Sequence, residues 1–268
     1  MQVIIITGAS EGIGAALARR MAERLGSSVA LVLAARSANK LEAVAEDCRR
    51  FGAHTFVRPA DLSIEAEARG LVADTATRFG RIDTLINNAG MSAHAYFEDV
   101  EDLGFYEQLM SINYWGAVWC THAALPHIKL QRGRIAAVSS LAGLTGVPGR
   151  TAYSSTKFAM AGFFDALRTE VARHGVSVTV VYPGVVLTDI RKHGYSADGT
   201  PAGESGLIER GAMSAETCAL LTDLAVERRQ RELVMTMKGK LGRWMKLVAP
   251  GLVDRMAWAA IAKRSKPS

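Results

Sequence analysis

Residues 3–14 read Val3-Ile-Ile-Ile-Thr-Gly-Ala-Ser-Glu-Gly-Ile-Gly14. The apolar, β-branched run predicts a buried strand over residues 3–7, and the pattern after the glycines predicts an amphipathic helix over residues 15–25. Glycines at this spacing let the backbone turn tightly and approach a pyrophosphate at the helix N-terminus, where free N–H groups favour an anion. The stretch therefore predicts a nucleotide-binding turn, and a tight turn that binds nothing is the alternative.

The rest of the chain alternates short β-branched runs with longer helical patterns. Its 268 residues fit one large domain, and an apolar fraction of 49% allows one sizeable core. Strands that alternate with helices usually pair in parallel, so the order predicts an α/β fold with a mainly parallel sheet. Further strands are expected at residues 29–34, 54–58, 84–86, 134–139 and 232–236.

Composition argues against several classes of protein. Three widely spaced cysteines suggest neither a disulfide framework nor a zinc site, and they fit a reducing, cytoplasmic location. No metal is expected, because His122 and His127 are five residues apart and cannot share one helical face. No apolar stretch approaches the ~20 residues of a membrane span, and residues 3–6 are expected as a strand rather than a signal peptide. A net charge of +6 with dispersed basic residues does not support nucleic-acid binding.

The residues after the second and third expected strands bear on the cofactor. An NAD-binding fold places an acidic side chain about 20 residues beyond the glycines, where it binds the ribose 2′-hydroxyl. This chain has Ala35 and Arg36 instead, which favours the 2′-phosphate of NADPH without excluding NAD. Arg36 as a solvated charge at a helix start is the alternative. Asp61 would either accept a bond from the adenine amino group or cap the helix expected over residues 64–79.

Tyr153 and Lys157 are four residues apart in a helical pattern and therefore share one helix face. A free phenol has a pKa of about 10, and an ammonium held nearby favours its ionised form. Such a tyrosine would act as a general acid or base near neutral pH. An ordinary exposed pair on a helix surface is the alternative.

Several motifs together resemble one family. The chain contains the glycine turn of residues 7–14, Asn-Asn-Ala-Gly at residues 87–90, then Ser140, Tyr153 and Lys157, and Pro-Gly-Val-Val-Leu-Thr at residues 183–188. The set is similar to the compact, single-domain short-chain dehydrogenase/reductases over about residues 3–190. The resemblance implies a doubly wound, mainly parallel, seven-stranded Rossmann sheet with helices on both faces.

The resemblance also implies a catalytic set. Asn113, in a helix expected over residues 107–125, corresponds to an asparagine that holds a water against the lysine. Ser140 corresponds to the serine that binds the substrate carbonyl, while Ser139 points the opposite way from the strand. The catalytic residues implied are Asn113, Ser140, Tyr153 and Lys157.

Residues expected to bind the cofactor come from several turns. Val186 and Thr188 resemble the segment that contacts the nicotinamide carboxamide. One position departs from the family, because many NADPH-preferring members carry a basic residue where this chain has Glu11. The expected set is Gly8, Ser10, Glu11, Gly12, Ile13, Gly14, Arg36, Asp61, Leu62, Asn88, Ala89, Gly90, Tyr153, Lys157, Pro183, Gly184, Val186 and Thr188.

The substrate side is expected to be mostly apolar, which suggests a hydrophobic ketone or alcohol. A flexible substrate loop is expected over residues 190–212. His94 would aid binding or would be a surface histidine without a role. Besides Ser140, the expected substrate contacts are Met91, Ser92, His94, Leu141 and Val147.

The chain after residue 237 departs from many tetrameric members of the family. Residues 1–237 are expected as the Rossmann domain and residues 238–268 as a basic, amphipathic extension, which loosely resembles the tails of reductases acting on lipids, steroids and retinoids. Its apolar residues recur near helical spacing among lysines and arginines. It would cover the substrate entrance, join a partner subunit in a homodimer or tetramer, rest on an anionic membrane, or simply pack on its own domain.

Together these patterns predict an NADPH-dependent carbonyl reductase or alcohol dehydrogenase. Hydride would pass between the nicotinamide and the substrate carbon while Tyr153 supplies or removes the proton on oxygen. A nucleotide-sensing module that keeps the fold but does no chemistry is the alternative.

Overall fold

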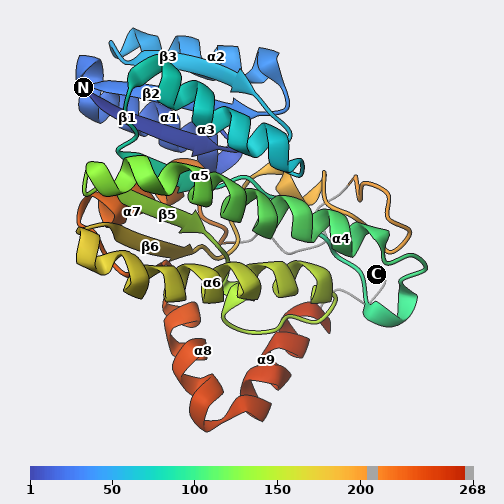
Figure 1. Ribbon diagram of the computed structural model, residues 1–268. Coiled ribbons are helices and arrows are strands. Elements are labelled where there is room, and N and C mark those ends of the chain that lie inside the picture. Colours follow the sequence, from blue (N-terminus) through green and yellow to red (C-terminus); the bar gives the residue numbers. More distant parts are fainter. Residues whose placement is uncertain (204–210, 263–268) are drawn as a thin grey trace.

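A computed structural model describes residues 1–203 and 211–262, and of residues 260–262 it describes only the backbone. The described residues form one sheet of seven strands in the order β3-β2-β1-β4-β5-β6-β7 (Figure 1). Every pairing between neighbouring strands is parallel, which confirms the predicted doubly wound sheet. The strands are β1 Gln2–Thr7, β2 Val29–Ala35, β3 His54–Pro59, β4 Thr84–Asn87, β5 Arg134–Val138, β6 Ser177–Tyr182 and β7 Glu232–Val234.

Helices cover both faces of the sheet because its central strands are apolar on both sides. Along β1, Val3 and Ile5 are buried in one apolar cluster, and Ile4 and Ile6 are buried in the other. The first cluster is completed by α3 Glu65–Phe79, α5 Gly116–Leu130 and α6 Thr151–Val171, and the second by α1 Gly12–Leu25, α2 Ala38–Arg50 and α7 Ala215–Glu227.

The strand order reverses between β1 and β4. From this point the chain builds β2 and β3 on one side and β5, β6 and β7 on the other, so the loops after β1 and β4 diverge. In open parallel sheets such a reversal leaves a crevice at the carboxyl ends of the strands, where ligands bind. The topology therefore places a binding site next to the glycine turn.

The helix predicted over residues 107–125 differs from expectation. It comprises α4 Gly104–Met110, a π-helical turn at Ser111–Trp115 and α5, which runs on to Leu130 with Pro126 inside it. A π-turn inserts one residue into a helix and rotates the following side chains, and such turns often lie at functional sites. The periodicity of apolar residues does not reveal this insertion. The prediction of a helix in this region is confirmed, but its predicted bounds, residues 107 and 125, were wrong.

The chain ends in a protruding helical hairpin, α8 Met237–Val248 and α9 Pro250–Ala262, which forms a V below the domain in Figure 1. The strand predicted over residues 232–236 stops at Val234, because the Thr236 hydroxyl caps α8 by accepting from the Gly239 N–H at 3.0 Å. Helix α8 buries no residue, and Trp244 and Val248 are 69% and 83% exposed. Hence much of its apolar surface does not pack on the domain, and residues 263–268 of the expected extension lie outside the described residues.

Three further findings bear on the predicted class of protein. Among the described residues, no helix is both long enough and apolar enough to span a bilayer. No group of three or more His, Cys, Asp or Glu side chains in that part of the chain is arranged to hold a metal ion. Cys48, Cys120 and Cys218 are free and buried, and burial raises the pKa of the Cys48 thiol to about 11.

Candidate active site

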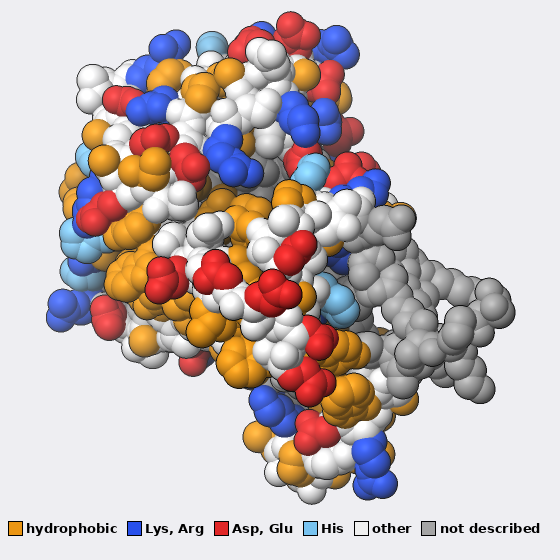
Figure 2. All heavy atoms as spheres, turned by 90° about the vertical axis from the view of Figure 1, so that its right-hand side faces the viewer, with side chains coloured by type: hydrophobic (Ala, Val, Ile, Leu, Met, Phe, Trp, Pro, Cys, Tyr) orange, Lys and Arg blue, Asp and Glu red, His pale blue; other side chains and the backbone are white. Residues whose placement is uncertain are grey.

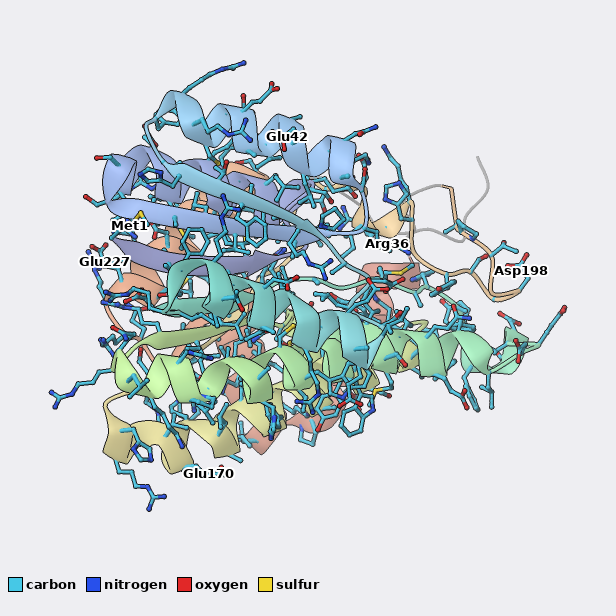
Figure 3. The ribbon with its side chains drawn as sticks, turned by 45° about the horizontal axis from the view of Figure 1, so that its top comes forward. Met1, Arg36, Glu42, Glu170, Asp198 and Glu227 are labelled. Atoms are coloured by element: carbon cyan, nitrogen blue, oxygen red, sulfur yellow. The ribbon has the colours of Figure 1, made fainter. Side chains whose placement is uncertain are left out.

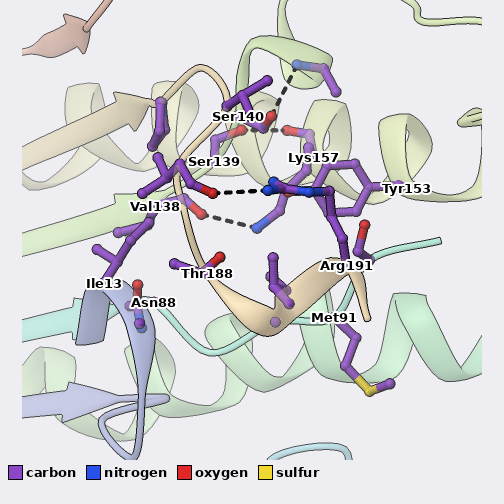
Figure 4. A pocket seen from close by; sticks show the side chains of 18 of the residues that line it. Ile13, Asn88, Met91, Val138, Ser139, Ser140, Tyr153, Lys157, Thr188 and Arg191 are labelled. Carbon is purple, nitrogen blue, oxygen red and sulfur yellow. Dashed lines mark hydrogen bonds between the residues drawn. The ribbon is translucent and has the colours of Figure 1, made fainter. Parts of the chain in front are cut away.

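A cavity of about 1130 Å³ lies at the carboxyl ends of β1, β4, β5 and β6 (Figure 4). It brings together most of the predicted site residues from turns that are far apart in the sequence. Those that line it are Gly8, Ser10, Glu11, Gly12, Ile13, Arg36, Leu62, Asn88, Ala89, Gly90, Met91, Ser92, Ser140, Leu141, Val147, Tyr153, Lys157, Pro183, Gly184, Val186 and Thr188. Four others, Gly14, Asp61, His94 and Asn113, do not line it.

The glycine turn has the conformation that its sequence requires. Gly8 and Gly12 have φ angles of +65° and +55°, in a region that favours glycine. A Cβ atom on Gly14 would lie 2.1 Å from the Gly8 carbonyl oxygen, so this position packs the helix against the turn instead of lining the cavity. The side chain of Glu11, which precedes α1, makes no capping hydrogen bond, so the N–H groups of the first helical turn suit an anion.

The loop after β4 is fixed to the glycine turn by Thr7, which sequence analysis missed. Its hydroxyl oxygen accepts from the backbone N–H groups of Asn88 and Ala89 at 2.9 and 3.0 Å. The Asn88 side chain in turn donates to the carbonyl oxygens of Thr7 and Gly8 at 3.0 and 3.2 Å. A polar residue at the end of an otherwise apolar strand was the signal available in the sequence.

Tyr153 and Lys157 lie one turn apart on α6, and both are buried, with only 8% and 3% of their surfaces exposed. The Lys157 ammonium lies 5.7 Å from the centroid of the Tyr153 ring and donates to the Val138 carbonyl oxygen at 2.9 Å (Figure 4). Burial lowers the pKa of Lys157, the neighbouring Tyr153 opposes this effect, and Arg150 adds to it. The pair is thus part of an enclosed site rather than an exposed helix pair.

Ser139 and Ser140 have the different surroundings that strand alternation predicts. The Ser139 hydroxyl donates to the Lys157 carbonyl oxygen at 3.1 Å and so joins β5 to α6. The Ser140 hydroxyl oxygen accepts from the Ala142 N–H at 3.2 Å and lies at the cavity with Tyr153 (Figure 4). This leaves the Ser140 hydroxyl proton to be donated to a bound oxygen.

Asn113 is fully buried in the π-turn and connects this turn to the loop after β4. Its Oδ1 accepts from the Met91 N–H at 2.7 Å, and its Nδ2 donates to the Met91 carbonyl at 2.9 Å and to Thr156 Oγ1 at 3.0 Å. A Cβ on Gly90 would lie 2.9 Å from Asn113 Oδ1 and 3.6 Å from the Lys157 nitrogen. Asn113 therefore lies directly behind the cavity wall, and its water-holding role stays a prediction.

Asp61 and His94 have local roles. One Asp61 carboxylate oxygen accepts from the N–H and hydroxyl of Ser63 at 3.0 and 2.7 Å, which closes the turn before α3. The backbone N–H of His94 donates to the Tyr195 carbonyl at 2.9 Å, and its ring packs against Gly149. The predicted adenine and substrate contacts of these two residues stay predictions. The alternative that Asp61 caps the helix is wrong, because the N-cap of α3 is Ile64, without a side-chain hydrogen bond.

Arg36 lies exposed beyond the end of β2, at the same end of the molecule as the loop that carries Asp198 (Figure 3). Lys40, which sequence analysis missed, adds a second cation from the first turn of α2. Its ammonium bonds the Glu11 carboxylate at 2.7 Å, and this bond raises the pKa of Lys40. Because exposed ion pairs are weak, Glu11 does not prevent Lys40 from binding an anion instead.

The other end of the cavity is largely apolar, and the C-terminal hairpin forms part of its wall. A Cβ on Gly239 would lie 2.4 Å from the Leu141 side chain, so α8 packs closely on the loop after β5. Residues 204–210 of the expected substrate loop lie outside the described residues. Sequence analysis did not place Ile112 and Arg150 here. Six further lining residues belong to the C-terminal extension, for which covering the substrate entrance was one of the expected roles: Lys238, Gly239, Gly242, Val253, Met256 and Ala257.

Comparison with known proteins agrees with this geometry. A family model described as short chain dehydrogenase matches residues 2–198. The chain is 40% identical to an 11-beta-hydroxysteroid dehydrogenase-like 4A of Arabidopsis thaliana over 69% of its own length, and it spans only 61% of that relative. It is 36% identical to 11-beta-hydroxysteroid dehydrogenase 1A of the same plant, over 94% of this chain and 73% of the relative.

Solved structures with the same fold carry related nucleotides. A short-chain dehydrogenase from Sphingobium yanoikuyae in complex with NADPH has a TM-score of 0.79 and 26% identity, covering 100% of this chain and 99% of that one. An alcohol dehydrogenase from Thermococcus sibiricus complexed with 5-hydroxy-NADP has a TM-score of 0.73 and 24% identity, covering 87% and 94%. The second likeness is one of fold alone.

The buried ammonium of Lys157 predicts a pH dependence of stability. At pH values below the lowered pKa of Lys157 in the folded protein, Lys157 is protonated in both the folded and the unfolded chain. The folded protein is then destabilised by the whole free-energy cost of burying a charged ammonium. As pH rises from there toward the ~10.4 of an unfolded lysine, the folded chain loses the proton first and this cost declines. The free energy of unfolding of the ligand-free protein should therefore rise with pH relative to that of Lys157→Met.

Denaturant unfolding at pH 7 to 9.5 measures this difference. The exposed Lys240 provides the control, because Lys240→Met should keep the pH dependence of the unchanged protein. A difference between the unchanged protein and Lys157→Met that stays flat or falls with pH would contradict the assignment of a buried ammonium.

Proposed function

Because the chain belongs to the short-chain dehydrogenases, we propose that it is an NADPH-dependent oxidoreductase that transfers hydride between the nicotinamide and a carbonyl or secondary alcohol. The observation that carries this proposal is the convergence of Ser140, Tyr153 and Lys157 in the cavity that the glycine turn also lines. Bound NADPH would supply the hydride, and the protein would supply the proton and the positioning.

The residues present fit such a cofactor. A Cβ on Gly8 would lie 2.8 Å from the Ala89 backbone, so the turn has the close packing that brings backbone toward a pyrophosphate. A Cβ on Gly12 would lie 3.0 Å from the Thr188 methyl group, so the turn and the segment expected at the carboxamide face each other across the site. Lys157 would hold the nicotinamide ribose, and Arg36 with Lys40 would hold the 2′-phosphate.

The chemical roles follow from the polar groups at the apolar end of the cavity. Ser140 would donate a hydrogen bond to the substrate oxygen, and Tyr153 would give that oxygen a proton in reduction or take it in oxidation. Lys157 would place its positive charge beside Tyr153, and Asn113 would position the loop and helix that hold both. The apolar lining by Val147, Met256 and their neighbours favours a hydrophobic substrate.

A non-catalytic nucleotide-sensing module is the competing function. Such a module has no use for an ammonium buried beside a tyrosine, because the burial disfavours its charge and weakens the fold. Turnover of NADPH with any carbonyl compound separates the two functions. Since the Arabidopsis relatives are named for 11-beta-hydroxysteroids, alicyclic ketones and alcohols of steroid size belong in the first panel.

Tyr153→Phe removes the proton donor while keeping the ring. We expect NADPH binding and folding to persist, and the turnover rate to fall by the ~10²–10⁴ typical of losing a general acid. Tyr182→Phe is the matched control, because Tyr182 is a buried tyrosine outside the cavity lining and its loss of a hydroxyl should leave turnover near normal. Near-normal turnover by Tyr153→Phe would remove this residue from the mechanism.

The cofactor preference is tested at the end of β2. The double substitution Ala35→Asp with Arg36→Ala replaces a phosphate partner by an acceptor for the ribose hydroxyls and adds repulsion toward the 2′-phosphate. We expect the ratio of kcat/KM for NADPH to that for NADH to reverse in favour of NADH. If the unchanged protein already uses NADH as well as NADPH, the assignment of Arg36 is wrong.

The C-terminal hairpin favours a second proposal, contact with an anionic membrane surface. Its tip exposes Trp244, Leu247 and Val248, and the exposed Lys240 belongs to the same helix. Figure 2 shows apolar side chains next to lysine and arginine on the part that protrudes at the bottom of the view. Aromatic and aliphatic side chains among cations suit the headgroup region of a bilayer.

Vesicle co-sedimentation tests this proposal. Trp244→Ser with Leu247→Ser should lower binding to vesicles of phosphatidylcholine and phosphatidylglycerol on the order of tenfold or more, because two exposed apolar side chains no longer insert. Leu130→Ser is the control, since Leu130 is 80% exposed at the end of α5, away from the hairpin. A double variant that binds vesicles normally but changes from oligomer to monomer would assign the tip to a homodimer or tetramer instead.

A further inference from the structure

Arg150 is a buried cation that the proposed chemistry does not use. It immediately precedes α6 and lies three residues before Tyr153, and only 8% of its surface is exposed. Its guanidinium carbon lies 4.3 Å from the centroid of the Tyr153 ring, and its Nη2 donates to the Ser92 hydroxyl oxygen at 2.7 Å. All three residues line the cavity, so the guanidinium is positioned at the substrate end.

This guanidinium has no anionic partner within the described residues. It carries five N–H donors, but Ser92 is its one hydrogen-bonded side chain there, and the buried Nε has no partner. Burial lowers the pKa of Arg150, Tyr153 raises it, and the charge of Arg191 lowers it further. Among the described residues that line the cavity, the carboxylates are Glu11 and Asp189, which bond Lys40 and Lys192 respectively.

A buried cation without a counter-ion is strongly unfavourable, and proteins usually pair such groups. Arg150 is not the one buried cation at this end of the cavity, because the Lys157 ammonium also lines it. Lys157 already donates a hydrogen bond to the Val138 carbonyl, and it is expected to bind the nicotinamide ribose. Arg150 is therefore available to bind an anion that arrives with the substrate.

We propose that Arg150 determines specificity by binding a carboxylate attached directly to the reacting carbonyl carbon, so that the enzyme acts on 2-oxo acids or 2-hydroxy acids. The inference rests on the proposed function. The guanidinium lies over the face of the same tyrosine whose hydroxyl meets the substrate oxygen, so a carboxylate one bond away from that carbon can reach it. A planar guanidinium binds a carboxylate through two parallel hydrogen bonds, which also fixes its orientation.

The reaction balances without any further reactant. In reduction, hydride adds to the carbonyl carbon and Tyr153 gives its proton to the oxygen, so a 2-oxo acid becomes a 2-hydroxy acid while the carboxylate stays unchanged. The third substituent on the carbon faces apolar walls that include Val147, Val253 and Met256. An aryl or branched alkyl group therefore fits better than a methyl group.

Steady-state kinetics with benzoylformate and its methyl ester test the inference, because the ester keeps the ketone and the phenyl group but replaces the negative charge of the carboxylate by a methyl ester. With NADPH, the unchanged protein should prefer the acid. In Arg150→Met, the ratio of kcat/KM for acid over ester should fall at least a hundredfold, mainly through the KM of the acid. Arg150→Lys keeps the positive charge but lacks the planar guanidinium that makes two parallel hydrogen bonds. Its acid-to-ester ratio should lie between those of the unchanged protein and Arg150→Met.

Lys238→Met is the matched control, since Lys238 also lines the cavity but is exposed on the hairpin. It tests whether the general positive field of the cavity explains the preference, and its acid-to-ester ratio should stay within about threefold of normal. A ratio that falls as far in Lys238→Met as in Arg150→Met would overturn the specific role of Arg150. The role would also be overturned if Arg150→Met lowered kcat/KM equally for acid and ester and shifted the pH profile. That result would show that Arg150 acts on Tyr153 and not on the substrate carboxylate.

Calorimetric binding separates this inference from the proposed function. Benzoylformate titrated into the protein with NADP⁺, which cannot donate hydride, should bind to the unchanged protein and at least a hundredfold more weakly to Arg150→Met. If no carbonyl compound is turned over but this difference in binding is found, the proposed reductase function fails and the carboxylate site stands. Equal binding by the two proteins, or none by either, overturns the site whatever the turnover.

Discussion

The interaction on which the site depends is the hydrogen bond from the buried Lys157 ammonium to the Val138 carbonyl oxygen. It joins the first turns of α6 to the end of β5, and the Ser139 hydroxyl joins the same two elements through the Lys157 carbonyl. The ammonium is thereby held beside Tyr153 although burial disfavours its charge. Removing water from this lysine is tolerable only because the sheet supplies a fixed acceptor. The same dehydration makes its field strong at the tyrosine.

Two buried cations, Lys157 and Arg150, line one end of the cavity, and the described acidic residues that line it, Glu11 and Asp189, are bonded to lysines. The ligand-free protein thus keeps like charges close together in a poorly hydrated space, which costs stability. A nucleotide with its phosphates offsets part of this charge, and a carboxylate on the substrate would offset more. The cavity of the folded protein therefore favours anions. An anionic ligand that binds only the folded protein should raise its free energy of unfolding.

Sequence was sufficient for those features that depend on neighbours in the chain. The alternation of strands and helices, the glycine turn and the spacing of Tyr153 and Lys157 are local patterns, and the sheet and cavity contain them as predicted. Features set by tertiary contact were not predictable. The π-turn contains Asn113, whose bonds to Met91 are tertiary contacts that no local pattern reveals. Arg150 is an ordinary arginine in the sequence, and only the fold places Ser92 and the Tyr153 ring against it. Lys40 resembled a helix-surface lysine because nothing local links it to Glu11.

The C-terminal hairpin has few contacts with the rest of the domain, and it also forms part of the cavity wall. Helix α8 has 12 residues and buries none of them, and helices this short are marginal in water without tertiary support. Its support comes from a few contacts: Gly239 against Leu141, Lys246 with the Leu144 carbonyl and the Phe158 ring, and, from α9, Trp258 stacked on Tyr96. Because Val253 and Met256 of the same hairpin line the cavity, a bound apolar group would add contacts to the hairpin. On the proposed function, a hydrophobic substrate would pack against the hairpin and would stabilise the same wall that admits it.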